Sequence, residues 1–132
     1  MEAVCHALLF ADKIITEKNG KKGLIGVFSR FSFPQFPATV PMWFIYADVA
    51  NITGKHKFSI SLVDESSQKN ILPIDGDINI PETGRNLEII IPVSRAAFQN
   101  PGNYVLSLKI NGTEVAARTL YVTKAEQGPS IN

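Results

Sequence analysis

The chain has 132 residues, of which 45% are hydrophobic and 19% are charged. This length fits one ordinary domain with a core of its own, and the composition excludes a disordered chain. The formal net charge is only +1, and the lysine and arginine residues are mostly scattered singly, so no basic surface for nucleic acid is expected.

The first apolar segment covers residues 3–11. It is far too short to span a membrane, and no positive residue precedes it as in a signal peptide, so it predicts a first β-strand. The only cysteine, Cys5, cannot form a disulfide within the chain, and nothing else marks an oxidising compartment. We therefore expect a cytoplasmic protein without a membrane partner.

The next segments alternate with the period of two that β-strands show. Residues 57–62 and 86–91 carry apolar side chains at every second position, as does the segment 104–110. Two further segments, "LIGVF" (24–28) and "MWFIYADV" (42–49), are apolar on both sides. Apolar residues on both sides are typical of central or well-covered strands, and we predict that position for both segments.

The dipeptide Asn111-Gly112 predicts a hairpin, because both residues tolerate the positive φ of a type I′ turn. Folding the chain there would pair Ile110 with Thr113, Lys109 with Glu114, and Leu108 with Val115. Beyond these pairs Leu120 and Val122 are out of phase with Val115, and a β-bulge near Ala117 would return them to the inner face.

Proline, glycine and asparagine residues separate about eight such short strands, and no long helical period occurs. One helical turn is predicted at residues 94–99, with Ser94 as its N-cap and Pro101 blocking its continuation. Many short strands with regular turns are typical of an all-β sandwich or barrel.

The segment "AAFQNPGNYVLSLKINGTEV" resembles the E–F corner and the last two strands of immunoglobulin-like folds, with Tyr104 in the place of the corner tyrosine. Leu106 stands where antibody domains have a cysteine. Together with "NGKKGLIGVFSRFSFPQFPATVP" and "GKHKFSISLVDE", the chain resembles a bacterial family of small immunoglobulin-like proteins without assigned function. The resemblance implies an immunoglobulin-like antiparallel β-sandwich of about 7–9 strands over residues 1–124. The composition of the last residues predicts a flexible tail at 125–132.

Residues with catalytic chemistry are few. A nucleophile built from Cys5 and His56 needs a proximity that the spacing does not show, and the acidic residues around Asp75 and Asp77 match no calcium loop. No phosphate-binding loop, dinucleotide fingerprint or paired-cysteine metal site occurs. We expect no catalytic residue, no cofactor and no metal, and hence no enzyme.

Aromatic residues are concentrated in one window, because seven of the twelve lie between residues 28 and 46. Prolines interrupt residues 31–41, so phenylalanines there must be buried under the sheet, at a subunit interface or on a ligand. We predict a lid on the core at Phe31 and contact with a partner at Phe33 and Phe36. The full predicted interaction surface consists of Phe31, Phe33, Phe36, Trp43 and Tyr46.

The function is not determined by these patterns. They favour a non-enzymatic protein-interaction or structural module, which binds another protein or a second copy of itself. The alternative is a sandwich that binds a carbohydrate or small ligand, with Trp43 or Tyr46 in the site.

Overall fold

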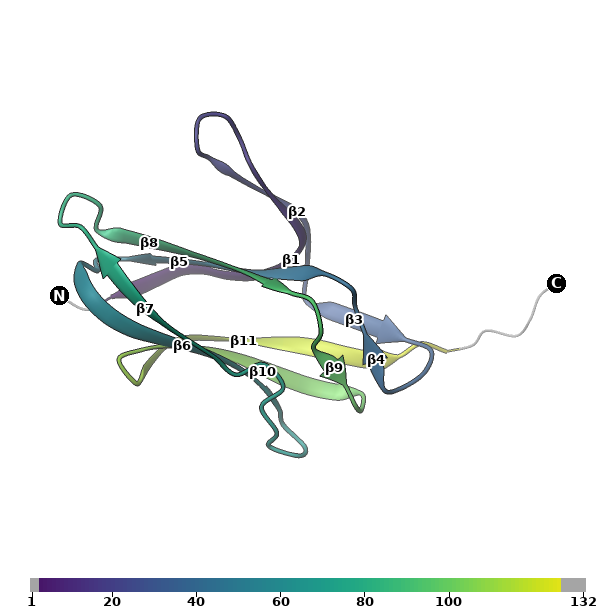
Figure 1. The fold of residues 1–132 in the computed structure, drawn as a ribbon. Coiled ribbons are helices and arrows are strands. Elements are labelled where there is room, and N and C mark those ends of the chain that lie inside the picture. Colours follow the sequence, from purple (N-terminus) through teal and green to yellow (C-terminus); the bar gives the residue numbers. More distant parts are fainter. Residues whose placement is uncertain (1–2, 127–132) are drawn as a thin grey trace.

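The computed structural model describes residues 3–126, which form an all-β sandwich (Figure 1). Sheet A has the strand order β2 (Lys22–Phe28), β1 (Val4–Thr16), β5 (Trp43–Ala50) and β8 (Asn86–Val93). Sheet B has the order β3 (Arg30–Phe33), β11 (Thr113–Lys124), β10 (Gly102–Ile110), β6 (Gly54–Asp64) and β7 (Ile74–Ile80). A short ribbon joins β4 (Ala38–Thr39) to β9 (Ala97–Phe98), and the parallel pair β3–β11 is the exception among otherwise antiparallel neighbours.

The all-β prediction is confirmed, although residues 3–126 form eleven strands because β3, β4 and β9 are short additions. The predicted helical turn at 94–99 is wrong. Ala97 and Phe98 pair with Thr39 and Ala38 instead. The Phe98 side chain is 0% exposed, so its burial in the core overrides the local helical preference of the preceding residues.

The core lies between the inner faces of the two sheets. On β5 every second residue from Trp43 to Val49 is 0% exposed. Residues of β10 at the same period, from Tyr104 to Ile110, face them from sheet B and are 7% exposed or less. The period of two that predicted these strands therefore also places their apolar residues inside.

The β10–β11 hairpin has the predicted turn, with φ values of 51° at Asn111 and 84° at Gly112. Its first predicted pairs, Ile110 with Thr113 and Lys109 with Glu114, are confirmed. The third is wrong, because Leu108 pairs with Ala116. The bulge thus falls at Val115, nearer the turn than the expected Ala117, and it has the expected effect of turning Leu120 and Val122 into the core.

Tyr104 is 1% exposed, and its hydroxyl donates a hydrogen bond of 2.7 Å to the carbonyl oxygen of Asn100. This bond returns from the start of β10 to the preceding corner, as predicted. Without this bond the buried Tyr104 hydroxyl would have no hydrogen-bond partner. The bond also links the corner to β10 and so fixes the direction in which the chain enters sheet B.

The β1–β2 hairpin extends beyond sheet A. Strand β1 pairs with β5 only as far as Ala11, and residues 13–16 pair with β2 alone. Gly26 has a φ of 68°, and a side chain there would collide with the Asp12 side chain, so the strands bend at this pair. Figure 1 shows the hairpin rising from sheet A on the side away from sheet B.

Two further predictions concern the ends and the membrane. Only Ala125 and Glu126 of the predicted tail 125–132 belong to the described residues, and the Ala125 N–H donates to the Phe33 carbonyl at 2.8 Å. From residue 3 to residue 126, no helix is long and apolar enough to cross a membrane.

Candidate interaction surface

The phenylalanines of the loop cover one end of the core. The Phe31 ring lies 5.6 Å from the Trp43 ring and 5.7 Å from the Phe98 ring. The Phe33 ring stacks on Phe98 at 5.8 Å, and Phe36 meets Phe33 edge-on at 5.8 Å. All three loop phenylalanines are half-buried and pack against the core, and we call them the aromatic end (Phe31, Phe33 and Phe36). Phe33 contacts the core as Phe31 does, and whether the aromatic end is a lid or an interface stays a prediction.

Trp43 is a core residue, although it was included in the predicted surface. Its side chain is 0% exposed and is surrounded by Phe10, Phe28 and Phe31 at ring distances of 5.6 to 6.0 Å. Its indole N–H finds no hydrogen-bond acceptor among residues 3–126. Trp43 is therefore not accessible to a protein or a sugar, and the ligand-binding alternative loses its tryptophan.

Tyr46 lies apart from the aromatic end, on the outward side of β5. Its hydroxyl donates a hydrogen bond of 2.6 Å to Glu88 Oε2. Burial raises the pKa of Tyr46, and the bond to the Glu88 carboxylate raises it further. The phenol is therefore a neutral donor that is already engaged, and the five predicted residues do not form one surface.

The outward side of sheet A carries a continuous apolar surface that sequence reasoning missed. Register places Leu9 beside Tyr46, and Tyr46 beside Ile90. Ala11 lies between Phe44 and Val27 in the same way. We call this surface the outer face of sheet A, defined by Leu9, Ala11, Val27, Phe44, Tyr46 and Ile90.

The outer face of sheet A is partly exposed. Ala11 is 0% exposed between its neighbours, and Leu9, Phe44, Tyr46 and Ile90 are half-buried. Val27 is 51% exposed, and the face continues onto the hairpin with Ile15 and Ile25, which are 41% and 49% exposed. In Figure 1, sheet B and the β4–β9 ribbon lie on the side of sheet A that is opposite to its outer face. The prediction that "LIGVF" is a central or covered strand is therefore wrong, because β2 is an edge strand with exposed isoleucine and valine.

Charged residues lie at the two ends of this face and not in its middle. Lys13 follows Ala11 at the hairpin end. At the other end Asp48 pairs with Glu88 across β5 and β8, and with Ala7 across β1 and β5. The face thus has one positive end, an apolar middle and one negative end.

Cys5 and His56, which we considered as a nucleophile and its base, each form hydrogen bonds with other residues. His56 Nε2 lies 2.6 Å from the Thr53 carbonyl oxygen, and His56 Nδ1 lies 2.8 Å from Asn111 Nδ2. The ring therefore donates to Thr53 and accepts from Asn111, which supports the β10–β11 turn. The Cys5 thiol donates to the Ala7 carbonyl at 3.1 Å, and burial raises the pKa of Cys5, which keeps it protonated.

Neither the histidine nor the acidic residues form a site of known chemistry. His56 lines an open hollow of about 780 Å³ at the end of the sandwich, whose wall mixes Glu82, Arg85 and Glu114 with apolar residues. Among residues 3–126, no three histidine, cysteine or acidic side chains gather closely enough to hold a metal ion.

A family model matches residues 6–123 of the chain, and its description is a family of unknown function, DUF6941. The chain belongs to this family. No curated protein matches it. The resemblance to a family without assigned function is thereby confirmed, while its immunoglobulin-like and bacterial character stay predictions.

One solved structure with a similar fold is the alkylpurine DNA glycosylase AlkC of Pseudomonas fluorescens, bound to DNA containing an abasic site analogue. The sequences are 10% identical, the TM-score is 0.51, and the match covers 92% of this chain but only 30% of the glycosylase chain. At this identity the likeness concerns the fold alone, and a fold does not carry a function with it.

Proposed function

We propose that this member of the family is a non-enzymatic protein-interaction module that binds its partner through the outer face of sheet A. The observation that supports this most is the uncovered apolar surface on that face. Scattered exposed apolar residues are normal on proteins, whereas a contiguous patch marks an interaction site.

The composition of the face also suits a protein partner. Its middle combines aliphatic side chains with Phe44 and Tyr46, and charged residues lie only at its ends. Protein interfaces have this arrangement of an aromatic-rich apolar centre within a polar rim. A small-ligand site would need polar groups that converge in a cavity, and the Tyr46 hydroxyl is already bonded to Glu88.

The aromatic end is the weaker candidate. Phe31 and Phe33 contact the buried rings of Trp43 and Phe98, so their apolar area already contributes to the core. On the outer face of sheet A only Ala11 is fully buried, and the other five side chains keep exposed apolar area that a partner could cover.

Three glutamate variants test the proposal. Val27→Glu and Phe44→Glu place a charge on the outer face of sheet A, and Val105→Glu places one on the outward side of β10 as the matched control. Each purified protein is immobilised and exposed to the wild-type chain and to an extract of the cells that produce it, and bound proteins are identified by mass spectrometry.

We expect the wild type and Val105→Glu to retain the same protein, and the two sheet A variants to lose it. Circular dichroism checks that each variant is folded. Retention by all four proteins alike, or by none of them, would overturn the proposal.

A further inference from the structure

We infer that the occupant of the outer face of sheet A is a second copy of this chain, packed face to face about a twofold axis with the β1 strands antiparallel. This inference rests on the proposed function, because it takes the outer face of sheet A to be a binding surface. It adds the identity of the partner and the geometry of the pair.

The layout of charge along the face carries the inference. Ala7 on β1 lies beside Asp48, and Lys13 lies six residues further along the same strand. At about 3.4 Å per residue, the two ends are about 20 Å apart along the strand, and closer than that in a straight line because β1 bends at Asp12. The midpoint falls at residue 10, between Leu9 and Ala11, which is also the middle of the apolar surface.

A twofold interface brings the same patch of both subunits together, so the patch must complement itself. A twofold axis between the two sheets, at right angles to β1 near residue 10, places Lys13 of each copy over Ala7 of the other, beside Asp48 on the neighbouring strand. Glu88 lies one strand further, and the apolar middles pack together. A parallel arrangement would set lysine against lysine and carboxylate against carboxylate, which is unfavourable. The face therefore complements a second copy of itself in the antiparallel sense.

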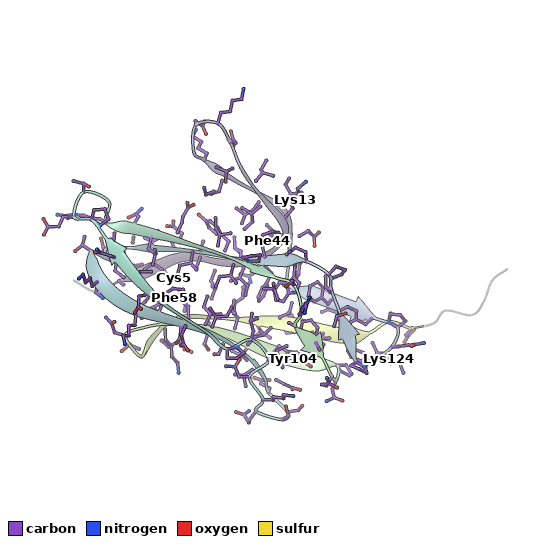
Figure 2. The ribbon with its side chains drawn as sticks, viewed as in Figure 1. Cys5, Lys13, Phe44, Phe58, Tyr104 and Lys124 are labelled. Atoms are coloured by element: carbon purple, nitrogen blue, oxygen red, sulfur yellow. The ribbon has the colours of Figure 1, made fainter. Side chains whose placement is uncertain are left out.

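The hairpin gives a second argument. Residues 12–26 contain four lysines against Asp12 and Glu17, so the hairpin is basic. It rises from sheet A on the side of the outer face, where Figure 2 shows Lys13 above Phe44. In the twofold pair the basic hairpin of each copy would contact the second copy, which would cover Ile15 and Ile25.

Sedimentation velocity over a range of protein concentrations tests the inference with a charge swap. Lys13→Glu and Asp48→Lys each set like charges against one another, and each should weaken the dimer about tenfold or more. The double variant Lys13→Glu/Asp48→Lys restores opposite charges and should dimerise more tightly than either single variant. Lys55→Glu, an exposed position on β6, is the matched control and should behave as the wild type.

The outcomes separate this inference from the proposed function. A wild-type chain that stays monomeric, yet captures a foreign protein that Val27→Glu fails to capture, overturns the second copy and leaves the outer face of sheet A as a binding surface. A dimer that Val27→Glu dissociates, but that shows no recovery in the charge swap, overturns the antiparallel arrangement. A dimer that neither Val27→Glu nor Phe44→Glu weakens overturns both proposals.

Discussion

The outward faces of the two sheets differ although their inward faces are alike. On sheet B, the outward positions of β6 and β10 are mostly polar (Ser59, Ser61, Ser107 and Lys109), with one apolar pair, Val63 and Val105. On sheet A, the outward positions of the two central strands are apolar. They are Leu9 and Ala11 on β1, and Phe44 and Tyr46 on β5. In both sheets every second residue points into the core, so the difference between their outward faces is not needed to form the core.

An antiparallel sheet needs one apolar face to fold, and its other face can be solvated. The outward face of sheet B is mostly polar despite Val63, Val105 and Tyr121, whereas the outward face of sheet A is mostly apolar. Val27, Ile25 and Ile15 gain little by folding, because they remain about half exposed. Their burial requires another molecule, and this distinction between folding residues and binding residues can be tested position by position.

The largest expected effect separates two neighbours on β5. Ile45 points inward and is 0% exposed, whereas Phe44 points outward and is half-buried. We expect Ile45→Ala to lower the free energy of unfolding by about 2–5 kcal/mol, and Phe44→Ala by about 1 kcal/mol. Denaturant unfolding at low protein concentration, where association does not contribute, measures both. Equal losses would show that Phe44 is structural.

The next effect tests whether the aromatic end is a lid. Phe33 stacks on the buried Phe98 ring, whereas Phe36 contacts the ring of Phe33 at the edge of the cluster. We expect Phe33→Ser to lower the free energy of unfolding by about 2 kcal/mol and Phe36→Ser by about 1 kcal/mol. Neither should change the solution mass. A smaller species with the fold retained would move the binding surface from sheet A to this end.

A smaller effect compares two tyrosine hydroxyls. Tyr104 donates to Asn100 inside the corner, and Tyr46 donates to Glu88 on the outer face of sheet A. Tyr104→Phe should cost about 1 kcal/mol of unfolding free energy, the usual net value of a buried hydrogen bond. Tyr46→Phe should cost a few tenths of that amount, since its bond is exposed. A Tyr104→Phe variant as stable as the wild type would contradict the role of the corner.

The same two tyrosines predict a weak dependence on alkaline pH. Burial raises the pKa of both Tyr104 and Tyr46 in the folded protein. Above about pH 10, where an unfolded tyrosine ionises, the unfolded chain therefore binds fewer protons than the folded one. Stability is then complete below about pH 10 and falls as the pH rises further. Urea unfolding from about pH 8 to 11 should show this fall, and a Tyr46→Phe/Tyr104→Phe variant should show less of it; an identical fall would assign it elsewhere.

The features that could be predicted from the sequence are those that local chemistry determines. Asn111-Gly112 predicted its turn because few residues adopt positive φ. The corner at Tyr104 was predicted from the resemblance to immunoglobulin-like folds, and its hydrogen bond to Asn100 agrees with it. The position of the bulge could not be read from the pattern. Val115 and Ala116 are both small apolar residues, so either one suits the inner face at that point.

The features that were missed depend on the tertiary structure. The residues before Phe98 favour a helical turn, but Phe98 fills the space between Trp43 and Tyr104, and its backbone pairs with β4. The outer face of sheet A left a signal in the apolar residues on both sides of 24–28 and 42–49. Such a pattern is the same for a strand covered by its own chain and for one covered by another molecule, so only the structure separates the two.

The most direct test compares Tyr46 on sheet A with Tyr121 on the outward side of sheet B. Tyr121 is 41% exposed, and no part of this account places a partner on it. Hydroxyl-radical footprinting, read by mass spectrometry at protein concentrations below and above that at which the chain associates, reports the accessibility of both rings. We predict that Tyr46 and Phe44 become protected as the concentration rises while Tyr121 keeps its rate of oxidation. Protection of Tyr121, or unchanged oxidation of Tyr46 and Phe44 in the associated protein, would contradict the assignment of the outer face of sheet A as the binding surface.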